Sequence, residues 1–497
     1  MMKKITRRSF VKSSALLIGG TAALSLTSRS YANIQGANER VRIAFAGCGG
    51  RGNEILPSFG KLEGVEIVWL ADPDAGRTES TAKKIEETFG NKPKTDADYR
   101  RILEDKDVDA LIVASCNHWH SLMAISACQA GKDVYVEKPC SQKLFEGRKI
   151  IEAAAKYKRL VQHGTQRRSE NSWAKTTAVI RQNKYGKLVA AKVYCHRPRG
   201  PLGFKPVGEA PKNLDWNLWI GPAAMTDYHA NLVHYNWHWF WNTGNGEIGN
   251  NGPHYFDLCR WAMQLDHPQS VISFGTRFVK DAKNNYKDQA ETPNIQFVVY
   301  DYNGVPLIYE SCNIAGPRSD WNPREEAEFF TEQGIVRGQK FFPYKSAANF
   351  EVGEESVDIK PDDFKAPAPG GPFGNFINAV RNRESVKLNA PITEGHYSVA
   401  LCHWGNAAYR MGESTDPTPL TKIREAMGDN KILQSSIEKV MVNVMSQLPD
   451  VKESDIPFHI GPKLQIDNDK EKFIGNALAD EQLTRKPREG FAVPENV

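Results

Sequence analysis

A glycine-rich turn and an acidic residue stand at the spacing that dinucleotide binding requires. The turn, residues 47–52, reads Gly-Cys-Gly-Gly-Arg-Gly, and Asp72 follows its last glycine by 20 residues. Gly47 suits a tight turn, Gly49 lets the backbone approach a pyrophosphate, and Gly52 permits close packing of a helix on a strand. An acid at this distance accepts hydrogen bonds from the ribose hydroxyls. These residues predict a dinucleotide cofactor.

Asp72 also indicates which dinucleotide binds. Its carboxylate would repel a 2′-phosphate, so NAD is favoured over NADP. Arg77 follows five residues later and keeps NADP open as the alternative.

Lys138 is a candidate for catalysis. It lies in the motif Glu137-Lys138-Pro139 after the apolar run 134–136, an expected strand, and therefore at the carboxyl edge where ligands of parallel sheets bind. A lysine there can hydrogen-bond a substrate hydroxyl and stabilise the oxygen from which a hydride departs. The motif alone could form a surface turn, but its place at the strand edge favours the functional interpretation.

Residues 216–241 are rich in aromatic side chains interleaved with histidines. Aromatic faces with polar edges suit a pyranose ring, although ordinary packing also explains several of them. The histidines raise a metal site as an alternative, but His234 and His238 stand in a non-helical loop without H-E-x-x-H spacing, so no metal is predicted. The aromatic residues are Trp216, Trp219, Tyr228, Tyr235, Trp237, Trp239, Phe240 and Trp241.

Two kinds of sheet are expected to position these groups. Apolar runs alternate with helix-like segments at first, which predicts an α/β nucleotide-binding (Rossmann) domain with a doubly wound parallel sheet. Later runs follow one another with few helices between them, which predicts an α+β domain with a large open, mainly antiparallel sheet. The early runs are 41–46, 65–71, 108–114, 134–136 and 160–162; the later ones are 188–194, 271–278, 295–300, 306–311 and 328–336, with helices at 254–263 and 394–411.

These patterns divide the chain into four parts. They are an export signal and linker at 1–36, the Rossmann domain at 37–165, the substrate and oligomerisation domain at 166–411, and a C-terminal extension at 412–497. The extension is polar and proline-dotted apart from an amphipathic stretch, so we expect it to wrap the surface or an oligomer neighbour.

The glycine turn, Asp72 and the Glu-Lys-Pro motif resemble those of the Gfo/Idh/MocA oxidoreductase family, over residues 40–410. The resemblance implies a Rossmann domain followed by an open antiparallel sheet. It also implies that Asn117 and His120, in the sequence Asn-His-Trp-His, lie beside the cofactor.

The family's second signature, Asp-x-Gly-x-His-x-x-Asp, corresponds to residues 250–257. By resemblance, His254 transfers the proton and Lys138 is its partner; a capping or core histidine is the alternative. Asn250 stands where many relatives carry Asp. An amide can hydrogen-bond a sugar hydroxyl, but it cannot take part in proton transfer.

The candidate site residues follow from these motifs. We expect catalysis by Lys138 and His254. Gln166 and Arg168 are included because they follow the last strand of the nucleotide domain, although a solvated turn equally explains the arginine. The expected cofactor-binding residues are Gly47, Gly49, Gly50, Arg51, Gly52, Asp72, Asn117, His120, Glu137, Lys138 and Gln166, and the expected substrate-binding residues are Lys138, His118, Arg168, Trp239, Asn250 and His254.

The N-terminus carries an export pattern. Residues 6–12 read Thr-Arg-Arg-Ser-Phe-Val-Lys, a twin-arginine pattern, and a small-x-small site follows at 30–32. The intervening apolar stretch is too short and too rich in Gly, Ser and Thr to span a bilayer comfortably. We expect a signal cleaved after export of the folded protein to the periplasm, with NAD tightly bound because free NAD is scarce there. A chance Arg-Arg pair and an uncleaved anchor are the alternatives.

Composition limits the partners. A formal net charge of +5 is small for 497 residues and includes the basic N-terminal segment, so neither nucleic acid nor a membrane surface is indicated. The eight cysteines are scattered without metal or thioredoxin spacing, which favours buried free thiols. The expected partners are a small carbohydrate and copies of this chain, in a dimer or tetramer built through the open sheet.

The sequence therefore predicts a periplasmic NAD-dependent oxidoreductase acting on a secondary hydroxyl of a sugar or glycoside, with C3 favoured. One alternative is a NAD-dependent redox glycosidase; such relatives generally show a Thr-His-Gly element that is not found at residues 250–254. The other is a non-enzymatic nucleotide or sugar sensor, against which the intact Lys138 and His254 argue.

Overall fold

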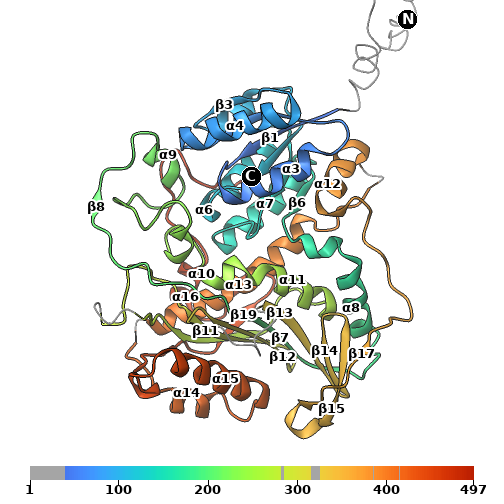
Figure 1. The fold of residues 1–497 in the computed structure, drawn as a ribbon, viewed down its shortest axis with the longest axis vertical. Coiled ribbons are helices and arrows are strands. Elements are labelled where there is room, and N and C mark those ends of the chain that lie inside the picture. The colour runs from blue at the N-terminus through green and yellow to red at the C-terminus, as the bar shows by residue number, and fades with distance from the viewer. Residues whose placement is uncertain (1–39, 281–284, 315–324, 384–385, 414) are drawn as a thin grey trace, which may run out of the picture. The chain divides into compact units, whose positions relative to one another are not determined.

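Six parallel strands form the first sheet, in the order β3-β2-β1-β4-β5-β6 (Figure 1). The computed structural model describes residues 40–280, 285–314, 325–383, 386–413 and 415–497, so the expected signal at 1–36 lies outside it. The strands are β1 (Val41–Ala46), β2 (Val65–Ala71), β3 (Lys94–Asp96), β4 (Ala110–Val113), β5 (Asp133–Val136) and β6 (Val161–His163). Strand β3 was not predicted, because its Lys-Thr-Asp sequence has no apolar run.

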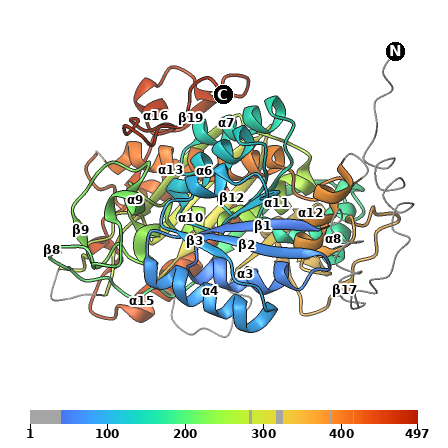
Figure 2. The same ribbon diagram turned by 90° about the horizontal axis from the view of Figure 1, so that it is seen from above.

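Helices cover both faces of this sheet, as Figure 2 shows. On β1, Ile43 and Phe45 pack on the side of α3, whereas Ala44 and Ala46 pack on the side of α6. Burial on both faces explains why these strands read as continuous apolar runs. The helices are α3 (Gly50–Gly60), α4 (Ala75–Phe89), α5 (Arg100–Glu104), α6 (Asn117–Gln129), α7 (Leu144–Lys156) and α12 (Gly371–Asn382).

The second sheet has twelve strands within the described residues. Its main path is β16-β15-β14-β13-β7-β12-β11-β10-β19-β20, and β7 and β12 are the parallel neighbours in a path that is otherwise antiparallel. The mainly antiparallel domain is therefore confirmed. The strands are β7 (Leu188–Cys195), β10 (Ser270–Thr276), β11 (Ile295–Tyr302), β12 (Val305–Cys312), β13 (Glu325–Thr331), β14 (Gly334–Arg337), β15 (Lys340–Ser346), β16 (Glu351–Val352), β17 (Val357–Asp358), β18 (His459–Ile460), β19 (Leu464–Asp467) and β20 (Lys472–Phe473).

One predicted strand is wrong: residues 328–336 belong to a hairpin. Strand β13 ends at Thr331 and β14 begins at Gly334, and the two pair antiparallel. The two-residue turn, Glu332-Gln333, lacks the Asn-Gly or Asp-Gly signal that usually marks such turns, so the apolar pattern reads as continuous.

Helices pack on both faces of the large sheet. One face carries α8 (Asn171–Arg181), α11 (Gly252–Met263) and α13 (Ile392–Glu413), whereas the other carries α14 (Leu420–Ala426) and α15 (Lys431–Gln447) (Figure 1). The C-terminal part of the chain thus does more than wrap the surface. It buries Leu433 and Val440 against the sheet and adds strands β18, β19 and β20 to it.

The segment between β7 and α11 holds the remaining short elements: β8 (Val207–Gly208), α9 (Trp216–Ile220), β9 (Tyr228–His229), η2 (Asn236–Trp239) and α10 (Gly246–Asn250). The 3-10 helix η1 (Gln166–Ser169) follows β6, and α16 (Ala477–Glu481) follows β20. All eight cysteines are free, and Cys116 is the one that is not fully buried. No helix of the described part of the chain is long and apolar enough to cross a membrane.

Candidate active site

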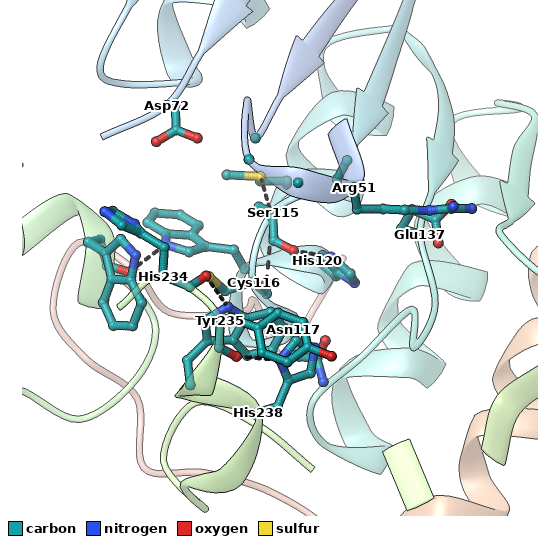
Figure 3. A pocket seen from close by; sticks show the side chains of 18 of the residues that line it. Arg51, Asp72, Ser115, Cys116, Asn117, His120, Glu137, His234, Tyr235 and His238 are labelled. Carbon is teal, nitrogen blue, oxygen red and sulfur yellow. Dashed lines mark hydrogen bonds and ion pairs between the residues drawn. The ribbon is translucent and has the colours of Figure 1, made fainter. Parts of the chain in front are cut away.

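A pocket of about 550 Å³ lies at the carboxyl edge of the six-stranded sheet. Its first wall is the glycine turn with Asp72, and its opposite wall comes from η2 and the junction of α10 and α11. Figure 3 shows Asp72 on one side and Tyr235 and His238 on the other. The pocket thus spans both predicted domains.

The glycine turn forms a cradle that side chains would fill. Gly47 has φ +102°, and a Cβ there would lie 2.5 Å from Ala114 O. A Cβ on Gly52 would lie 2.1 Å from Gly47 O, so turn and helix α3 meet without room for a side chain. Gly49 and Gly50 face the pocket. The N-terminus of α3 therefore presents free backbone N–H groups to the pocket, which fits a pyrophosphate.

Asp72 ends β2 with its carboxylate held in place. Oδ2 accepts a hydrogen bond from Cys48 N at 2.8 Å, and Oδ1 accepts one from Asp74 N at 2.9 Å. Burial raises the pKa of Asp72, while these backbone donors lower it. The Arg77 side chain also lies in the pocket, because a Cβ on Gly49 would meet its Nη1 at 2.5 Å. The Asp72 carboxylate, which suits a ribose hydroxyl pair, and the Arg77 guanidinium, which suits a phosphate, thus line the same part of the pocket.

Arg51 and Glu137 form an ion pair on another wall of the pocket (Figure 3). Arg51 donates to Glu137 Oε1 at 2.8 Å, and Gln166 donates to the same oxygen at 2.9 Å and to Tyr135 OH at 2.8 Å. Burial lowers the pKa of Arg51, but the adjacent Glu137 carboxylate raises it above its ordinary value overall. This network fixes the loop that carries Lys138.

Lys138 projects from that loop toward the start of α11. Its Nζ donates to Asn250 O at 2.5 Å across the pocket. The pKa of Lys138 is lowered, chiefly by burial and also by Arg51, while Glu137 raises it. An ammonium with one carbonyl partner keeps two N–H donors for a substrate oxygen.

His254 lies in the first turn of α11 and lines the same pocket. Its Nδ1 is buried without a hydrogen-bond partner among the described residues. Burial, followed by the charges of Lys138 and Arg167, holds the pKa of His254 well below its ordinary value. The imidazole is therefore neutral near pH 7 and able to accept a proton. Asn250, one turn earlier, also lines the pocket.

Asn117 and His120 both line the pocket from the start of α6. Asn117 Nδ2 donates to Asn245 Oδ1 at 3.1 Å. The two ring nitrogens of His120 lie 2.6 Å from Pro139 O and 2.9 Å from Ser115 O, so this ring braces the loop after Lys138.

Three expected substrate ligands do not line the pocket. His118 has its ring nitrogens 3.0 Å from Trp219 O and 3.3 Å from Thr243 O, and burial lowers its pKa to about 3. Arg168 pairs with Asp257 at 2.7 Å and with Glu394 at 3.0 Å. Trp239 is buried, with the Arg199 guanidinium 5.2 Å from its ring.

Other side chains in the pocket were not singled out from the sequence. Ser115, Cys116 and Arg197 carried no motif, whereas Tyr235 and His238 were noticed only as part of the aromatic segment. His238 Nδ1 lies 2.6 Å from Tyr235 O, and burial lowers the pKa of this histidine to about 3. Among the described residues, no group of three or more His, Cys, Asp or Glu side chains could hold a metal ion.

A Rossmann sheet with a glycine turn and an acid at its carboxyl edge, facing a lysine and a neutral histidine, defines a nucleotide-dependent oxidoreductase. Residues 41–165 match the family model described as "Oxidoreductase family, NAD-binding Rossmann fold", and residues 202–314 match "Oxidoreductase family, C-terminal alpha/beta domain". The chain belongs to the Gfo/Idh/MocA oxidoreductase family, whose first domain is described as NAD-binding.

Solved structures share the fold. The WlbA dehydrogenase from Bordetella pertussis, in complex with NADH and UDP-GlcNAcA, is 17% identical, with a TM-score of 0.52 over 73% of this chain and 94% of that chain. The WlbA dehydrogenase from Chromobacterium violaceum gives the same identity and TM-score over 73% and 91%.

Curated relatives carry glycosidase names. A "Glycosyl hydrolase family 109 protein 2" from Shewanella sp. (strain ANA-3) is 26% identical over 61% of this chain and 66% of its own length. An "Alpha-N-acetylgalactosaminidase" from Shewanella oneidensis is 26% identical over 40% of this chain. The chain spans 48% of that enzyme, so each match covers less than two thirds of the relative.

Proposed function

We propose that this protein transfers a hydride between a secondary ring hydroxyl of a sugar or glycoside, with C3 favoured, and NAD. The observation that carries the proposal is that His254, whose buried Nδ1 has no hydrogen-bond partner among the described residues, lies in one pocket with Lys138, the glycine turn and Asp72. A base and an oxyanion stabiliser are the two groups that alcohol oxidation requires.

The two side chains divide the proton chemistry. His254 takes the proton from the hydroxyl oxygen, and Lys138 donates a hydrogen bond to that oxygen while negative charge develops on it. Nicotinamide, when bound, supplies the hydride acceptor at its C4 atom. Asn250 is placed to hydrogen-bond a neighbouring hydroxyl and so to select the carbon that reacts.

NAD is the cofactor that Asp72 favours. Its carboxylate is fixed by two backbone N–H groups at the strand end and faces the position where a ribose hydroxyl pair binds. Arg77 is the residue that would support NADP. Titration of the nucleotide-free protein with each dinucleotide tests the preference.

A redox glycosidase is the second candidate, and two observations favour it. The curated relatives carry glycosyl hydrolase names. Besides His254, the pocket is lined by three further imidazoles, those of His120, His234 and His238. A glycosidase that oxidises C3 and then eliminates the aglycone needs another base for the C2 proton. Asn250 cannot act as that base, so one of the pocket histidines would have to take its place.

One experiment separates the two candidates. The protein, loaded with NAD, is given a panel of α- and β-glycosides in deuterated water, and products are followed by mass spectrometry. Net oxidation yields a keto-glycoside and NADH with the glycosidic bond intact. Release of many aglycone molecules per bound nucleotide, with deuterium at C2 of the sugar, establishes the glycosidase instead. If neither a keto-glycoside nor free aglycone forms with any member of the panel, the sensor is the remaining candidate.

The location and assembly also belong to the proposal. The twin-arginine pattern at residues 6–12 supports export of the folded, nucleotide-loaded protein to the periplasm. Fractionation of cells expressing the wild type and the Arg7→Lys, Arg8→Lys variant tests it, because the variant should stay in the cytoplasm. We further propose a homo-oligomer, which sedimentation of the purified protein tests.

A further inference from the structure

The segment of residues 213–239, called the strap below, lies across the cofactor pocket. It contributes Leu218, Trp219 and His234 to the pocket wall, together with residues of η2. The strap follows β7 in the chain and so lies outside the Rossmann domain, yet it contacts the Rossmann residues directly after Asp72. The position of the strap therefore sets the shape of this part of the pocket.

On one side the strap is tied to the Rossmann domain beside Asp72. Asn213 Nδ2 donates to Asp74 Oδ1 at 2.8 Å, and His234 Nε2 lies 3.2 Å from Asp74 Oδ2. Two backbone hydrogen bonds run alongside, from Ala75 N to Asn213 O and from Asp215 N to Pro73 O, each at 2.9 Å.

In the middle of the strap, α9 rests on Trp119, which lines the same pocket. Trp119 Nε1 donates to Leu218 O at 3.0 Å and to Trp219 O at 3.1 Å. The approach is close enough that a Cβ on Gly221 would lie 2.1 Å from the Trp119 ring. The position of α9 and that of the pocket wall are thus coupled.

The last residues of the chain, 484–497, called the tail below, reach this junction. Arg488 Nη1 donates to Gly221 O at 2.7 Å and to Asn217 O at 3.2 Å, and its Nη2 donates to Asn217 Oδ1. A guanidinium on these carbonyls stabilises the C-terminal end of α9, where the helix dipole favours positive charge.

The tail also packs against Trp119 from outside the pocket. Phe491 is 8% exposed and meets the Trp119 ring edge to face at 5.6 Å, and the guanidinium of Arg488 lies 4.6 Å from the Phe491 ring. Two anchors hold the tail on the Rossmann domain: Arg485 pairs with Glu146, and Lys156 Nζ donates to Val497 O at 2.5 Å. Accordingly, the end of the chain lies close to α7 in Figures 1 and 2.

From these contacts we infer that the tail is a latch for the strap and that Arg488 and Phe491 set the rate at which the dinucleotide leaves. Leaving requires α9 to lift from Trp119, and lifting breaks the Arg488 hydrogen bonds and the Phe491 contact. The inference needs only the dinucleotide pocket and is independent of the sugar chemistry proposed above.

The test measures nucleotide release without any sugar. NADH is bound to the full-length purified protein and excited by energy transfer from tryptophan, since Trp219 and Trp237 line the pocket. Excess ADP-ribose, which competes for the site and does not fluoresce, is then added. Losing hydrogen bonds and packing of this size corresponds to a rise of about tenfold in the dissociation rate constant. We expect such a rise in Arg488→Ala and Phe491→Ala.

Matched variants separate a latch from a general loss of structure. Lys486→Ala and Glu495→Ala change exposed residues of the same tail and should release NADH at the wild-type rate. Asn213→Ala loosens the strap from its other side and should also speed release with the tail intact. Hydrogen exchange in residues 213–239 should rise in Arg488→Ala and not in Lys486→Ala. Wild-type release in Arg488→Ala, Phe491→Ala and Asn213→Ala, or equally fast release in the two control variants, overturns the inference.

Discussion

Replacing Lys138 by Met or His254 by Ala should stop hydride transfer while the nucleotide stays bound. Met preserves the stem of the lysine and removes its charge. The glycine turn and Asp72 are the groups proposed to hold the nucleotide, and neither substitution touches the contacts that shape them. Both variants should therefore bind NAD with nearly the wild-type dissociation constant.

The magnitudes follow from what each group contributes. Lys138 uses one N–H donor for Asn250 O, which leaves its other donors for a substrate oxygen. Removing its ammonium group therefore resembles removing one oxyanion-hole donor, which lowers the rate by about 10²- to 10³-fold. Loss of the His254 base should cost about 10²- to 10⁴-fold. Because both act on one oxygen and its proton, the double variant should be little slower than the worse single variant.

Single-turnover formation of NADH with the best glycoside of the panel is the assay. Lys106→Met and His459→Ala, which change side chains away from the pocket, are the matched controls and should keep the wild-type rate. Wild-type rates in both Lys138→Met and His254→Ala would refute this reasoning and would favour the hypothesis of a non-enzymatic sensor. Loss of nucleotide binding in either variant would show that the side chain holds the cofactor.

Three further outcomes are expected. Asp72→Ala should weaken NAD binding and reduce the ratio of NAD affinity to NADP affinity in calorimetric titrations; a wild type that binds NADP more tightly than NAD would contradict this. Burial keeps the pKa of His163 at about 3 against about 6.5 in the unfolded chain, so its contribution to stability falls as pH drops below about 6.5. Between pH 7 and pH 5, the free energy of unfolding should fall by about 2 kcal/mol less in His163→Phe than in the wild type, as chemical unfolding at both pH values can measure. Arg168→Gln should lower that free energy by about 3–5 kcal/mol, because it leaves the fully buried Asp257 without its charged partner, and should spare the rate per folded molecule; a specific rise in KM would instead make Arg168 a substrate ligand.

The nucleotide-binding half of the site can be predicted from the sequence because each of its parts is a short motif at a strand end. The glycine turn, Asp72 and Lys138 each stand at the end of a strand, and parallel strands bring their carboxyl ends to one edge. The contact of Lys138 with Asn250 joins residues far apart in the chain. No spacing rule predicts it, and the family resemblance supplied that half of the site.

The errors at two of the three misplaced substrate ligands, His118 and Trp239, have a common geometric cause. Within the first turn of α6, Asn117 and His120 are three residues apart and share a face, whereas His118 is rotated about 100° per residue away from it. The sequence shows a cluster of polar residues but not the rotation of the helix. The same holds in η2, where His238 lines the pocket and Trp239 turns into the core.

Lys138 and His254 are two buried basic side chains with opposite roles in the proposed reaction. Burial lowers the pKa of both Lys138 and His254, and the charge of Lys138 lowers the pKa of His254 further. An unperturbed lysine titrates roughly four units above an unperturbed histidine, which favours Lys138 as the hydrogen-bond donor and His254 as the proton acceptor of the proposed reaction. With His254 as the proposed base, Asn250 can stand where many relatives carry Asp without removing that base.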